Sequence, residues 1–197
     1  MTGAPVRSAS RRRDTRETKI SADVLIDGTG VGSITLPLPF FRHMIEAFTK
    51  YSGMDITLDG SGDIDVDAHH LVEDVGLVLG GTVSDALGDR DGIRRFGEAH
   101  APLDESLVRC VVDYGRRPNV VYAMDQLQGR INDFDVEVIG EFVKGYAQAA
   151  GATIHLDCIR GDNPHHIAEA AFKALGLATR DAFRVIGGGV PSTKGTL

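Results

Sequence analysis

The spacing of apolar residues along the chain alternates between a period of two, typical of strands, and a period near 3.6, typical of helices. In the first half of the chain these periods predict two strands, a helix, a third strand and a second helix. Glycines and acidic residues separate the segments and indicate turns. The predicted elements are Thr18–Ile26, Gly32–Leu36, Phe40–Tyr51, Asp55–Leu58 and Leu71–Leu87.

The same order of periods recurs in the second half. There it predicts strands at Ser106–Asp113, Asn119–Met124 and Thr153–Leu156, and helices at Val138–Ala150 and Ile167–Phe183. The recurrence indicates an internally duplicated α+β fold, with halves of strand, strand, helix, strand, helix. Because the leading strands follow one another closely, we expect hairpin neighbours, and a sheet with helices on one face in each half.

Segments without a core-forming pattern divide the chain. The start is rich in Arg and Ser without a following apolar segment, so we expect residues 1–15 to form a mobile arm, with a remnant of a targeting segment as the alternative. Gly, Asp and Arg are dense near Gly88–Pro102, which places the first half at 16–96 and the second at 97–185. The glycine-rich end, 186–197, is expected to be a tail.

A short histidine string occurs twice in matching contexts. HHLVE at residues 69–73 recurs as HHIAE at residues 165–169, each after a predicted strand and at the start of a predicted helix. Adjacent residues at a helix start point about 100° apart, so neighbouring histidines do not readily hold one ion together. The glutamate that follows lies over one histidine of its string. Each string therefore offers ligands to two ions.

Two such strings related by a pseudo-twofold axis would furnish two metal sites, with His43 and His155 completing the shells. Imidazole with carboxylate suits Mn, Fe, Ni or Zn better than Ca or Mg. The strings contain no thiolate, which argues against a closed structural zinc site. One string alone, or His43 alone, would more often be an ordinary core or surface feature, and we interpret His100 in that way. The duplication is what favours metal binding.

Composition narrows the function classes. The chain has 197 residues, 42% of them hydrophobic and 25% charged, as in ordinary globular proteins. A net charge of -7 disfavours nucleic acid as a partner, so a phosphate site should be local. No apolar run approaches the roughly 18 residues of a membrane-spanning helix, so no membrane partner is expected. Cys110 and Cys158 form no CxxC pattern, which favours a reduced, cytoplasmic location.

Further short strings are spread over the chain in a fixed order. They are Arg16-Glu17-Thr18, Asp27-Gly28-Thr29-Gly30, His43-Met44, His69-His70 with Glu73-Asp74, Arg95-Phe96-Gly97, Pro102 with Asp104-Glu105, Arg117-Pro118, Gly161 with Asn163 and His165-His166, Glu169 with Phe172-Lys173-Ala174, and Ser192-Thr193-Lys194-Gly195. In this order the chain resembles the imidazoleglycerol-phosphate dehydratase family over nearly its whole length, from Arg16 to Leu197.

The resemblance implies an enzyme, a carbon-oxygen lyase of histidine biosynthesis, with a duplicated fold of the ribosomal protein S5 domain 2-like class. It also implies two manganese ions per chain, bound where subunits of a homo-oligomer meet, in an octahedral 24-mer. By motif position, the implied metal ligands are His43, His69, His70, Glu73, His155, His165, His166 and Glu169.

The family reaction removes water from D-erythro-imidazole glycerol phosphate to give imidazole acetol phosphate. The resemblance implies proton transfer by Glu169 and Glu17, the latter also a substrate contact. Metal coordination of the substrate imidazole would lower its N–H pKa and favour loss of the C3 hydroxyl, after which a carboxylate removes the C2 proton. The implied phosphate-binding residues are Arg95, Arg117, Lys173, Ser192 and Lys194, in agreement with a local phosphate site.

The chain departs from the family's pattern beside several of these residues. Similar proteins carry Asp where this chain has Arg42 and Ala68, His where it has Tyr51, Thr where it has Leu71, and Ser-Gly where it has Gly115-Arg116. None of these changes removes an implied ligand, but neighbours of ligands orient imidazoles and tune a metal. Two alternatives therefore stay open: a non-catalytic, metal-organised paralogue and a binuclear metallohydrolase.

Overall fold

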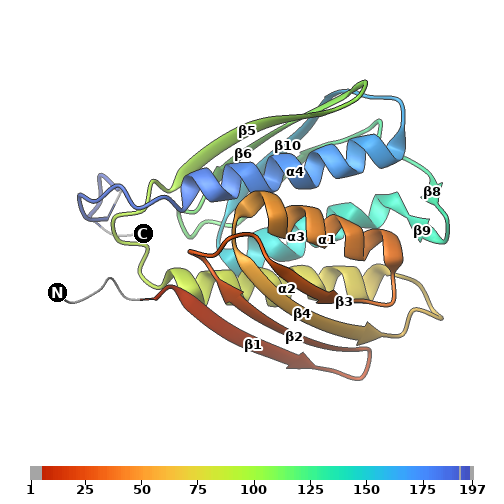
Figure 1. Ribbon diagram of the computed structural model, residues 1–197, viewed down its shortest axis with the longest axis horizontal. Coiled ribbons are helices and arrows are strands. Elements are labelled where there is room, and N and C mark those ends of the chain that lie inside the picture. Colours follow the sequence, from red (N-terminus) through yellow and green to blue (C-terminus); the bar gives the residue numbers. More distant parts are fainter. Residues whose placement is uncertain (1–5, 191, 196–197) are drawn as a thin grey trace.

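The computed structural model describes residues 6–190 and 192–195, which form two four-stranded sheets with helices between them (Figure 1). The first sheet has the order β1-β2-β4-β3, in which β3 pairs with β4 in parallel and the other neighbours are antiparallel. Its strands are β1 (Ser8–Asp14), β2 (Thr18–Leu25), β3 (Gly32–Thr35) and β4 (Asp55–Gly62).

The second sheet repeats the first. Its order is β5-β6-β10-β7, and the last strand again pairs in parallel with its neighbour. The equal order and direction of pairing confirm the predicted duplication of an α+β fold. The elements of the second half other than its two long helices are β5 (Phe96–Leu103), β6 (Ser106–Asp113), β7 (Asn119–Ala123), β8 (Arg130–Ile131), β9 (Phe134–Asp135), the 3-10 helix η1 (Val136–Val138) and β10 (Thr153–Arg160).

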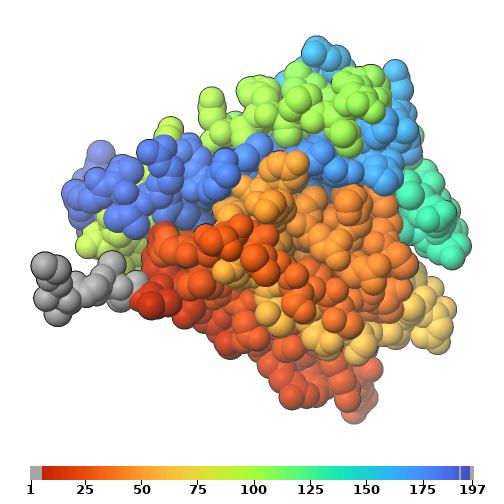
Figure 2. All heavy atoms as spheres, viewed as in Figure 1, coloured from red at the N-terminus to blue at the C-terminus, as the bar shows by residue number. Residues whose placement is uncertain are grey.

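The long helices lie between the two sheets and begin at the same end of the molecule, the right-hand end in Figure 1. They are α1 (Pro39–Ser52), α2 (His69–Leu87), α3 (Ile139–Ala150) and α4 (Pro164–Ala182). The helices pair across the halves, since α1 packs on α4 and α2 packs on α3. The surface of α1 (orange) adjoins that of α4 (blue) in Figure 2. Within the described residues, no helix has the length and apolar character needed to cross a bilayer.

Glycines let the paired helices approach one another closely. Gly80 on α2 faces the carbonyl oxygen of Tyr146 on α3, and Gly176 on α4 faces that of Phe48 on α1. A Cβ at either glycine would overlap the facing backbone. Because the two glycines hold the same position after their histidine strings, the two helix pairs are two copies of one arrangement.

The structure corrects the expectation of a mobile arm over residues 1–15. Residues 8–14 of that segment form β1, which pairs with β2 along its full length. Within β1, Arg13 forms an ion pair of 2.9 Å with the buried Asp74 on α2. Residues 1–5 lie outside the described part of the chain.

A second correction concerns β5, which occupies a stretch expected to be part of the join between the halves. Its inward-facing residues are Gly97, Ala99 and Ala101, whose small side chains give little hydrophobic signal. The hairpin partners of β2 and β6 are β1 and β5. The expected neighbours, β2 with β3 and β6 with β7, are therefore not adjacent. The strand that follows the first helix of each half, β4 or β10, lies between them.

Candidate metal centre

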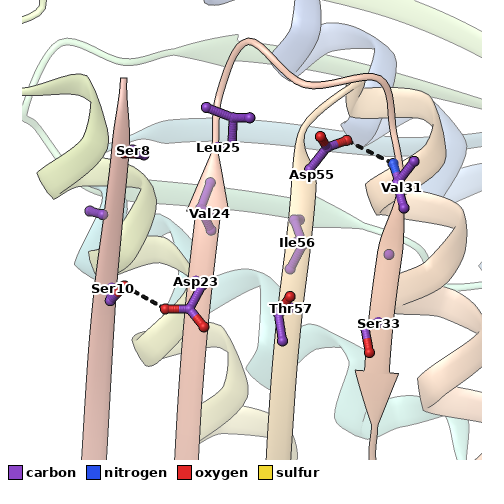
Figure 3. Close-up of a pocket in the computed structure, with 12 residues that line it drawn as sticks. Ser8, Ser10, Asp23, Val24, Leu25, Val31, Ser33, Asp55, Ile56 and Thr57 are labelled. Carbon is purple, nitrogen blue, oxygen red and sulfur yellow. Dashed lines mark hydrogen bonds between the residues drawn. The ribbon is translucent and has the colours of Figure 1, made fainter. Parts of the chain in front are cut away.

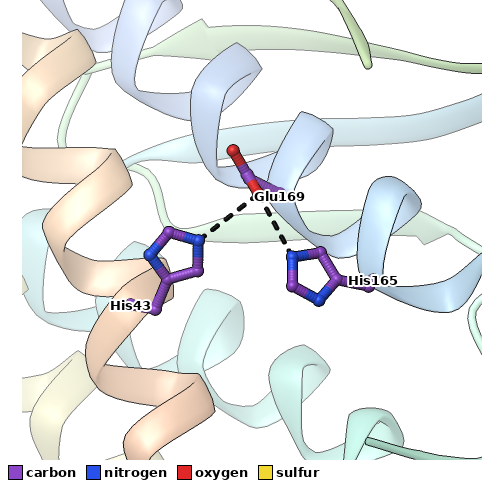
Figure 4. Close-up of side chains that lie close together, drawn as sticks. All are labelled: His43, His165 and Glu169. Carbon is purple, nitrogen blue, oxygen red and sulfur yellow. Dashed lines mark hydrogen bonds and ion pairs between the residues drawn. The ribbon is translucent and has the colours of Figure 1, made fainter. Parts of the chain in front are cut away.

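Two histidines and a glutamate from opposite halves converge near the starts of α1 and α4 (Figure 4). Nε2 of His43, on α1, lies 3.3 Å from Oε2 of Glu169, on α4. Nε2 of His165 lies 3.3 Å from the same oxygen. The cross-pairing of helices thus brings together residues that are far apart in the sequence.

The start of α4 explains why His165 and Glu169 share a face. The side chain of Asn163 accepts a hydrogen bond of 2.9 Å from the backbone N–H of His165 and so caps the helix. Pro164 follows, and its fixed φ and missing N–H suit the first turn. The helix therefore begins just before the histidine string, and residues four apart become neighbours on its surface.

Aromatic side chains of α1 and α4 pack together beside the cluster and hold it in place. The buried ring of Phe40 lies edge-on to the ring of His165, with 5.2 Å between centroids. Phe41, also buried, packs edge-on against Phe172 of α4 at 6.5 Å. Both contacts join α1 to α4, so the distance between the two histidines is set by the core rather than by the side chains alone.

The ligand atoms fit a divalent metal ion. One atom from each of His43, His165 and Glu169 lies within 4.8 Å of the other two. Such ions bind imidazole nitrogen and carboxylate oxygen at about 2.0–2.2 Å, which places neighbouring ligands roughly 3–3.5 Å apart. The two 3.3 Å separations match this spacing. Three protein ligands also leave coordination positions for a substrate or for further residues.

Glu169 is held in its anionic form. Its Oε1 forms an ion pair of 2.8 Å with Nζ of Lys173, and this ammonium also lies 5.6 Å from the ring centre of Tyr51. Burial opposes the charge on Glu169, but the hydrogen bond and charge of Lys173, followed by those of His43, hold its pKa below the usual value. Glu169 can therefore serve as an anionic ligand at neutral pH.

The first histidine string does not close a cluster within one chain. Nε2 of His69 lies 3.9 Å from Oε2 of Glu73, and both side chains are 45% exposed. Helix α2 thus presents the same histidine-glutamate pair as α4, at the same place in its helix. Within the described chain, no imidazole from the paired helix α3 joins this pair.

Glu141 stands on α3 at the position that corresponds to His43 on α1, and it was not predicted as a site residue. It stands as far before Gly151, which ends α3, as His43 stands before Gly53, which ends α1. Both glycines are in the left-handed conformation, so they mark equivalent points of the two halves. This register makes Glu141 the position in the second half that corresponds to His43 in the first. The Glu141 carboxylate lies 2.8 Å from Nζ of Lys144.

The second histidine of each string bonds to a carboxylate through Nδ1. For His70 the partner is Oδ2 of Asp63, at 3.1 Å, and for His166 it is Oε2 of Glu105, at 2.7 Å. The hydrogen bonds to Asp63 and Glu105 raise the pKa of His70 and His166 respectively. The bond from His166 in turn holds the pKa of Glu105 far below its usual value.

His155 lies apart from the other predicted ligands. It is exposed on β10, on the face of the second sheet that points away from the helices. Its register neighbours are Val111 on β6 and Val121 on β7. One chain does not bring His155 to the cluster, so its role as a ligand stays a prediction.

The predicted arginines lie at the other end of α4. The backbone N–H of Arg95 bonds to the carbonyl oxygen of Ala182, the last residue of that helix. Its guanidinium forms a two-pronged pair with Asp113, with Nε and Nη2 at 2.6 and 2.9 Å from the carboxylate oxygens. Nη2 of Arg117 lies 4.0 Å from the same carboxylate. Asp113 thus pairs with Arg95 and lies beside Arg117.

The predicted tail is described only in part. Its backbone returns toward the join between the halves, where the N–H of Gly92 bonds to the carbonyl oxygen of Gly189. Farther on, the N–H of Lys194 bonds to Oγ of Ser192 at 3.2 Å, within a turn. Residues 191 and 196–197 lie outside the described part. Phosphate binding by Ser192 and Lys194 stays a prediction.

Glu17 lies in the turn between β1 and β2, beside the first histidine string. Its carbonyl oxygen accepts a hydrogen bond of 3.1 Å from the N–H of Asp63. Glu17 and Asp63 line one small depression together with Arg16 and Lys19. The hydrogen bond to Asp63 is the largest cause of the raised pKa of His70, and the negative charge of Glu17 raises it further.

The departures from the family's pattern leave the cluster intact. Arg42 extends toward Glu46 of its own helix, at 3.8 Å. Ala68 cannot cap α2 with its side chain, but Oδ1 of Asp67 accepts the N–H of His69 at 2.8 Å instead. Leu71 is fully buried and belongs to the core.

A depression on the outer face of the first sheet is separate from all predicted site residues (Figure 3). Ser10, Asp23 and Thr57 are among the residues that line it. At its rim Oδ1 of Asp55 accepts the backbone N–H of Val31 at 2.9 Å, which fixes the loop before β3. The depression contains no histidine, so we assign it no part in the metal centre.

Comparisons with known proteins agree with these observations. A family profile described as imidazoleglycerol-phosphate dehydratase matches residues 37–179. A protein of that name from Thioalkalivibrio sulfidiphilus is 45% identical over 194 residues, covering 97% of this chain and 98% of the relative. Another from Hydrogenobaculum sp. is 46% identical over 192 residues, covering 98% of this chain and 100% of the relative.

Solved structures show the same similarity. The imidazoleglycerol-phosphate dehydratase of Staphylococcus aureus superposes with a TM-score of 0.81 at 30% identity, covering 90% of this chain and 99% of the other. That of Pyrococcus furiosus gives 0.79 at 37% identity, covering 95% and 100%. The profile spans most of the chain and the relatives match almost all of it, so this chain belongs to the imidazoleglycerol-phosphate dehydratase family, whose members are hydro-lyases.

Proposed function

We propose that this protein removes water from D-erythro-imidazole glycerol phosphate to give imidazole acetol phosphate, a step of histidine biosynthesis. The observation that carries the proposal is the convergence of His43, His165 and Glu169, because an ion held there has open positions for a substrate imidazole. The relatives described above are named for this dehydration, which supports the same reaction here.

Manganese is the proposed ion, with two ions per chain. The two copies of the histidine-glutamate pair, on α4 and α2, support two sites, and their nitrogen and oxygen donors suit this metal. When bound, such an ion lowers the pKa of the substrate's ring N–H and favours departure of the neighbouring hydroxyl.

Proton transfer falls to Glu17 and Glu169. Glu169 has one oxygen paired with Lys173 and the other shared by two histidines, which suits a ligand that also orients the substrate ring. Glu17 sits in a turn beside His70 and suits the base that removes the C2 proton. Loss of that proton and of the C3 hydroxyl amounts to one water, and the remaining enol becomes the ketone.

The metal cluster and the arginines cannot hold one substrate molecule within one chain. His165 lies in the first turn of α4, and Arg95 bonds to Ala182 at its end. At about 1.5 Å of rise per residue, roughly 25 Å separates them, far more than a three-carbon chain between ring and phosphate can span. We therefore propose that each site combines the metal ligands of one chain with Arg95 and Arg117 of another, in a closed homo-oligomer such as an octahedral 24-mer.

Phosphate binding at a distance from the reacting carbons would orient the ring between the ions. Arg95 and Arg117 supply planar donor groups that match phosphate oxygens, and Ser192 and Lys194 would add a hydroxyl and a charge. Both cysteines are buried and unpaired, which supports a reducing compartment, and we propose the cytoplasm.

The proposal is tested with purified protein, manganese and imidazole glycerol phosphate. We expect an enolisable ketone and no free phosphate, loss of activity on chelation, and recovery with manganese. Glu169→Gln should lower kcat by about 100-fold or more. Glu98→Gln, on the exposed face of β5, is the matched control and should keep wild-type activity.

Two other results would replace the proposal with one of its alternatives. Release of inorganic phosphate would indicate a binuclear hydrolase. Assembly that responds to manganese while turnover stays absent would indicate a non-catalytic paralogue.

A further inference from the structure

The second histidine of each string is held by an acidic residue from a different segment. Nδ1 of His166 lies 2.7 Å from Glu105, in the turn between β5 and β6, and Nδ1 of His70 lies 3.1 Å from Asp63, just after β4. A neutral imidazole has one N–H donor and one acceptor nitrogen. If Nδ1 carries the proton and donates it to the carboxylate, Nε2 keeps the lone pair that binds a metal.

Glu105 divides its two oxygens between different tasks. Oε1 accepts the hydroxyl of Ser106 at 2.9 Å and the backbone N–H of Asn163 and Asp162 at 3.0 and 3.4 Å. Oε2 accepts Nδ1–H of His166. One oxygen therefore fastens the turn to the loop before α4, and the other orients the histidine.

The opposite side of the His166 ring is not held by a hydrogen bond of this kind. Nε2 lies 3.8 Å from Oδ2 of Asp104, which is beyond hydrogen-bond distance. The ring is 26% exposed. Gly161 packs closely on Ser106, and a Cβ there would clash with the Ser106 hydroxyl. The turn that carries Glu105 therefore packs against the loop before α4, and it holds the His166 ring through Nδ1.

We propose that Glu105 and Asp63 are positioning residues that fix the tautomer of His166 and His70, so that each ring presents Nε2 to a metal ion. The proposal rests on the metal-dependent function proposed above. It assigns to two acidic residues outside the predicted ligand set the task of orienting two ligands. Carboxylates that receive the second N–H of a ligand histidine commonly have this effect.

Glu105→Gln tests the proposal sharply. The amide oxygen can keep the three contacts of Oε1, whereas the amide NH2 then faces Nδ1 of His166. An NH2 group only donates, so Nδ1 must become the acceptor and the proton moves to Nε2, where it blocks the metal. We expect the affinity for Mn²⁺, measured by calorimetry on the assembled protein, to fall by about 10- to 100-fold.

Two comparisons separate orientation from general damage. Asp157→Asn removes the partner of Arg109 on the outer face of the same sheet and should leave Mn²⁺ affinity unchanged. In a His166→Ala background, Glu105→Gln should cause no further loss of affinity, because its effect passes through that ring. The metal-free Glu105→Gln protein should unfold within a few degrees of the metal-free wild type.

Wild-type affinity in Glu105→Gln would overturn the inference while leaving the proposed function standing. So would an equal further loss in the His166→Ala background, which would show that Glu105 acts on the fold. A wild-type protein that binds no Mn²⁺ at all would instead overturn the metal-dependent function, and this inference with it.

Discussion

The position of the Arg95 side chain is set by its immediate neighbours. Its backbone has a φ of 70°, and its guanidinium lies 4.7 Å from the ring centre of Phe96 while paired with Asp113. The group passes directly over Gly115, where an added Cβ would lie 2.5 Å from Nη2. The position of this guanidinium therefore depends on the absence of a side chain at Gly115.

Gly115→Ala is therefore expected to displace the Arg95 guanidinium. Losing a charged hydrogen bond to the substrate phosphate should raise KM by about 10-fold while kcat holds, because the metal cluster is untouched. Steady-state kinetics on imidazole glycerol phosphate measure this. Gly140→Ala, where a Cβ meets only ordinary contacts with Tyr122, is the control. An unchanged KM in Gly115→Ala would contradict the role of Arg95.

Helices from opposite halves form the pairs that carry the histidines, and the contact between them is set by glycines. Gly80 on α2 faces the backbone of Tyr146 on α3, where an added Cβ would lie 2.3 Å from the carbonyl oxygen. Gly176 makes the equivalent contact between α4 and α1, the two helices that carry Glu169 and His43. Helix spacing is thus the link between core packing and the metal site.

Gly80→Ala should force α2 and α3 apart. We expect it to destabilise the protein by about 1–3 kcal/mol, the usual cost of overfilling a packed core, in spite of the better helix propensity of alanine. Denaturant unfolding of the metal-free protein measures the change. Gly140→Ala, in the same helix pair, should be neutral or stabilising, and equal stabilities of the two variants would argue against close packing at Gly80.

Acid should weaken the loop before β3. Hydrogen bonds from the backbone N–H of Val31 and Thr29 hold the pKa of Asp55 below its usual value. A depressed pKa adds stability that is present above the unfolded value, about 3.9, and disappears as pH falls through the folded value. Asp55→Asn should therefore lower Tm at neutral pH, and the difference from wild type should shrink below about pH 3.9. A difference independent of pH would contradict this account.

The sequence predicted the elements with strong periodicity and missed those without it. The four long helices and the strands β2 and β4 have large apolar side chains at regular positions. β1 is rich in arginine, and β5 buries glycine and alanine, so neither carries a clear alternation. The prediction of hairpins between the leading strands was wrong because it did not include the edge strands β1 and β5.

For the site, the repeated strings located the histidines and their glutamates, since these lie close together in sequence. Glu105 and Asp63 could not be assigned, because their contacts with His166 and His70 depend on how the turns pack. The repeat register places Glu141 at the position that corresponds to His43, whereas ligation by His155 stays a prediction. Single-residue roles that depend on tertiary contacts are not encoded in local spacing.

At the scale of the whole molecule, both histidine strings lie at the starts of helices, and these starts share one end of the molecule in Figure 1, whereas Arg95 bonds to the last residue of α4. The first string is open to solvent, and the arginines are distant from the cluster of the same chain. We therefore expect a working site to need at least two chains.

Mixing two inactive variants tests this arrangement. Glu169→Gln alters a proposed metal ligand and Arg117→Ala removes a proposed phosphate ligand, so we expect each variant alone to be nearly inactive. In assemblies formed from equal amounts of both, random placement leaves about a quarter of the sites with both groups intact, and activity should return to about that fraction. Activity confined to the sum of the separate variants would show that each chain holds a complete site.

The most direct test of the metal centre is an anomalous difference map from crystals grown with manganese. The account predicts a peak bounded by Nε2 of His43, Nε2 of His165 and Oε2 of Glu169, at about 2.0–2.2 Å from each. A map with no peak there, in which both imidazoles still hydrogen-bond to Glu169, would contradict it.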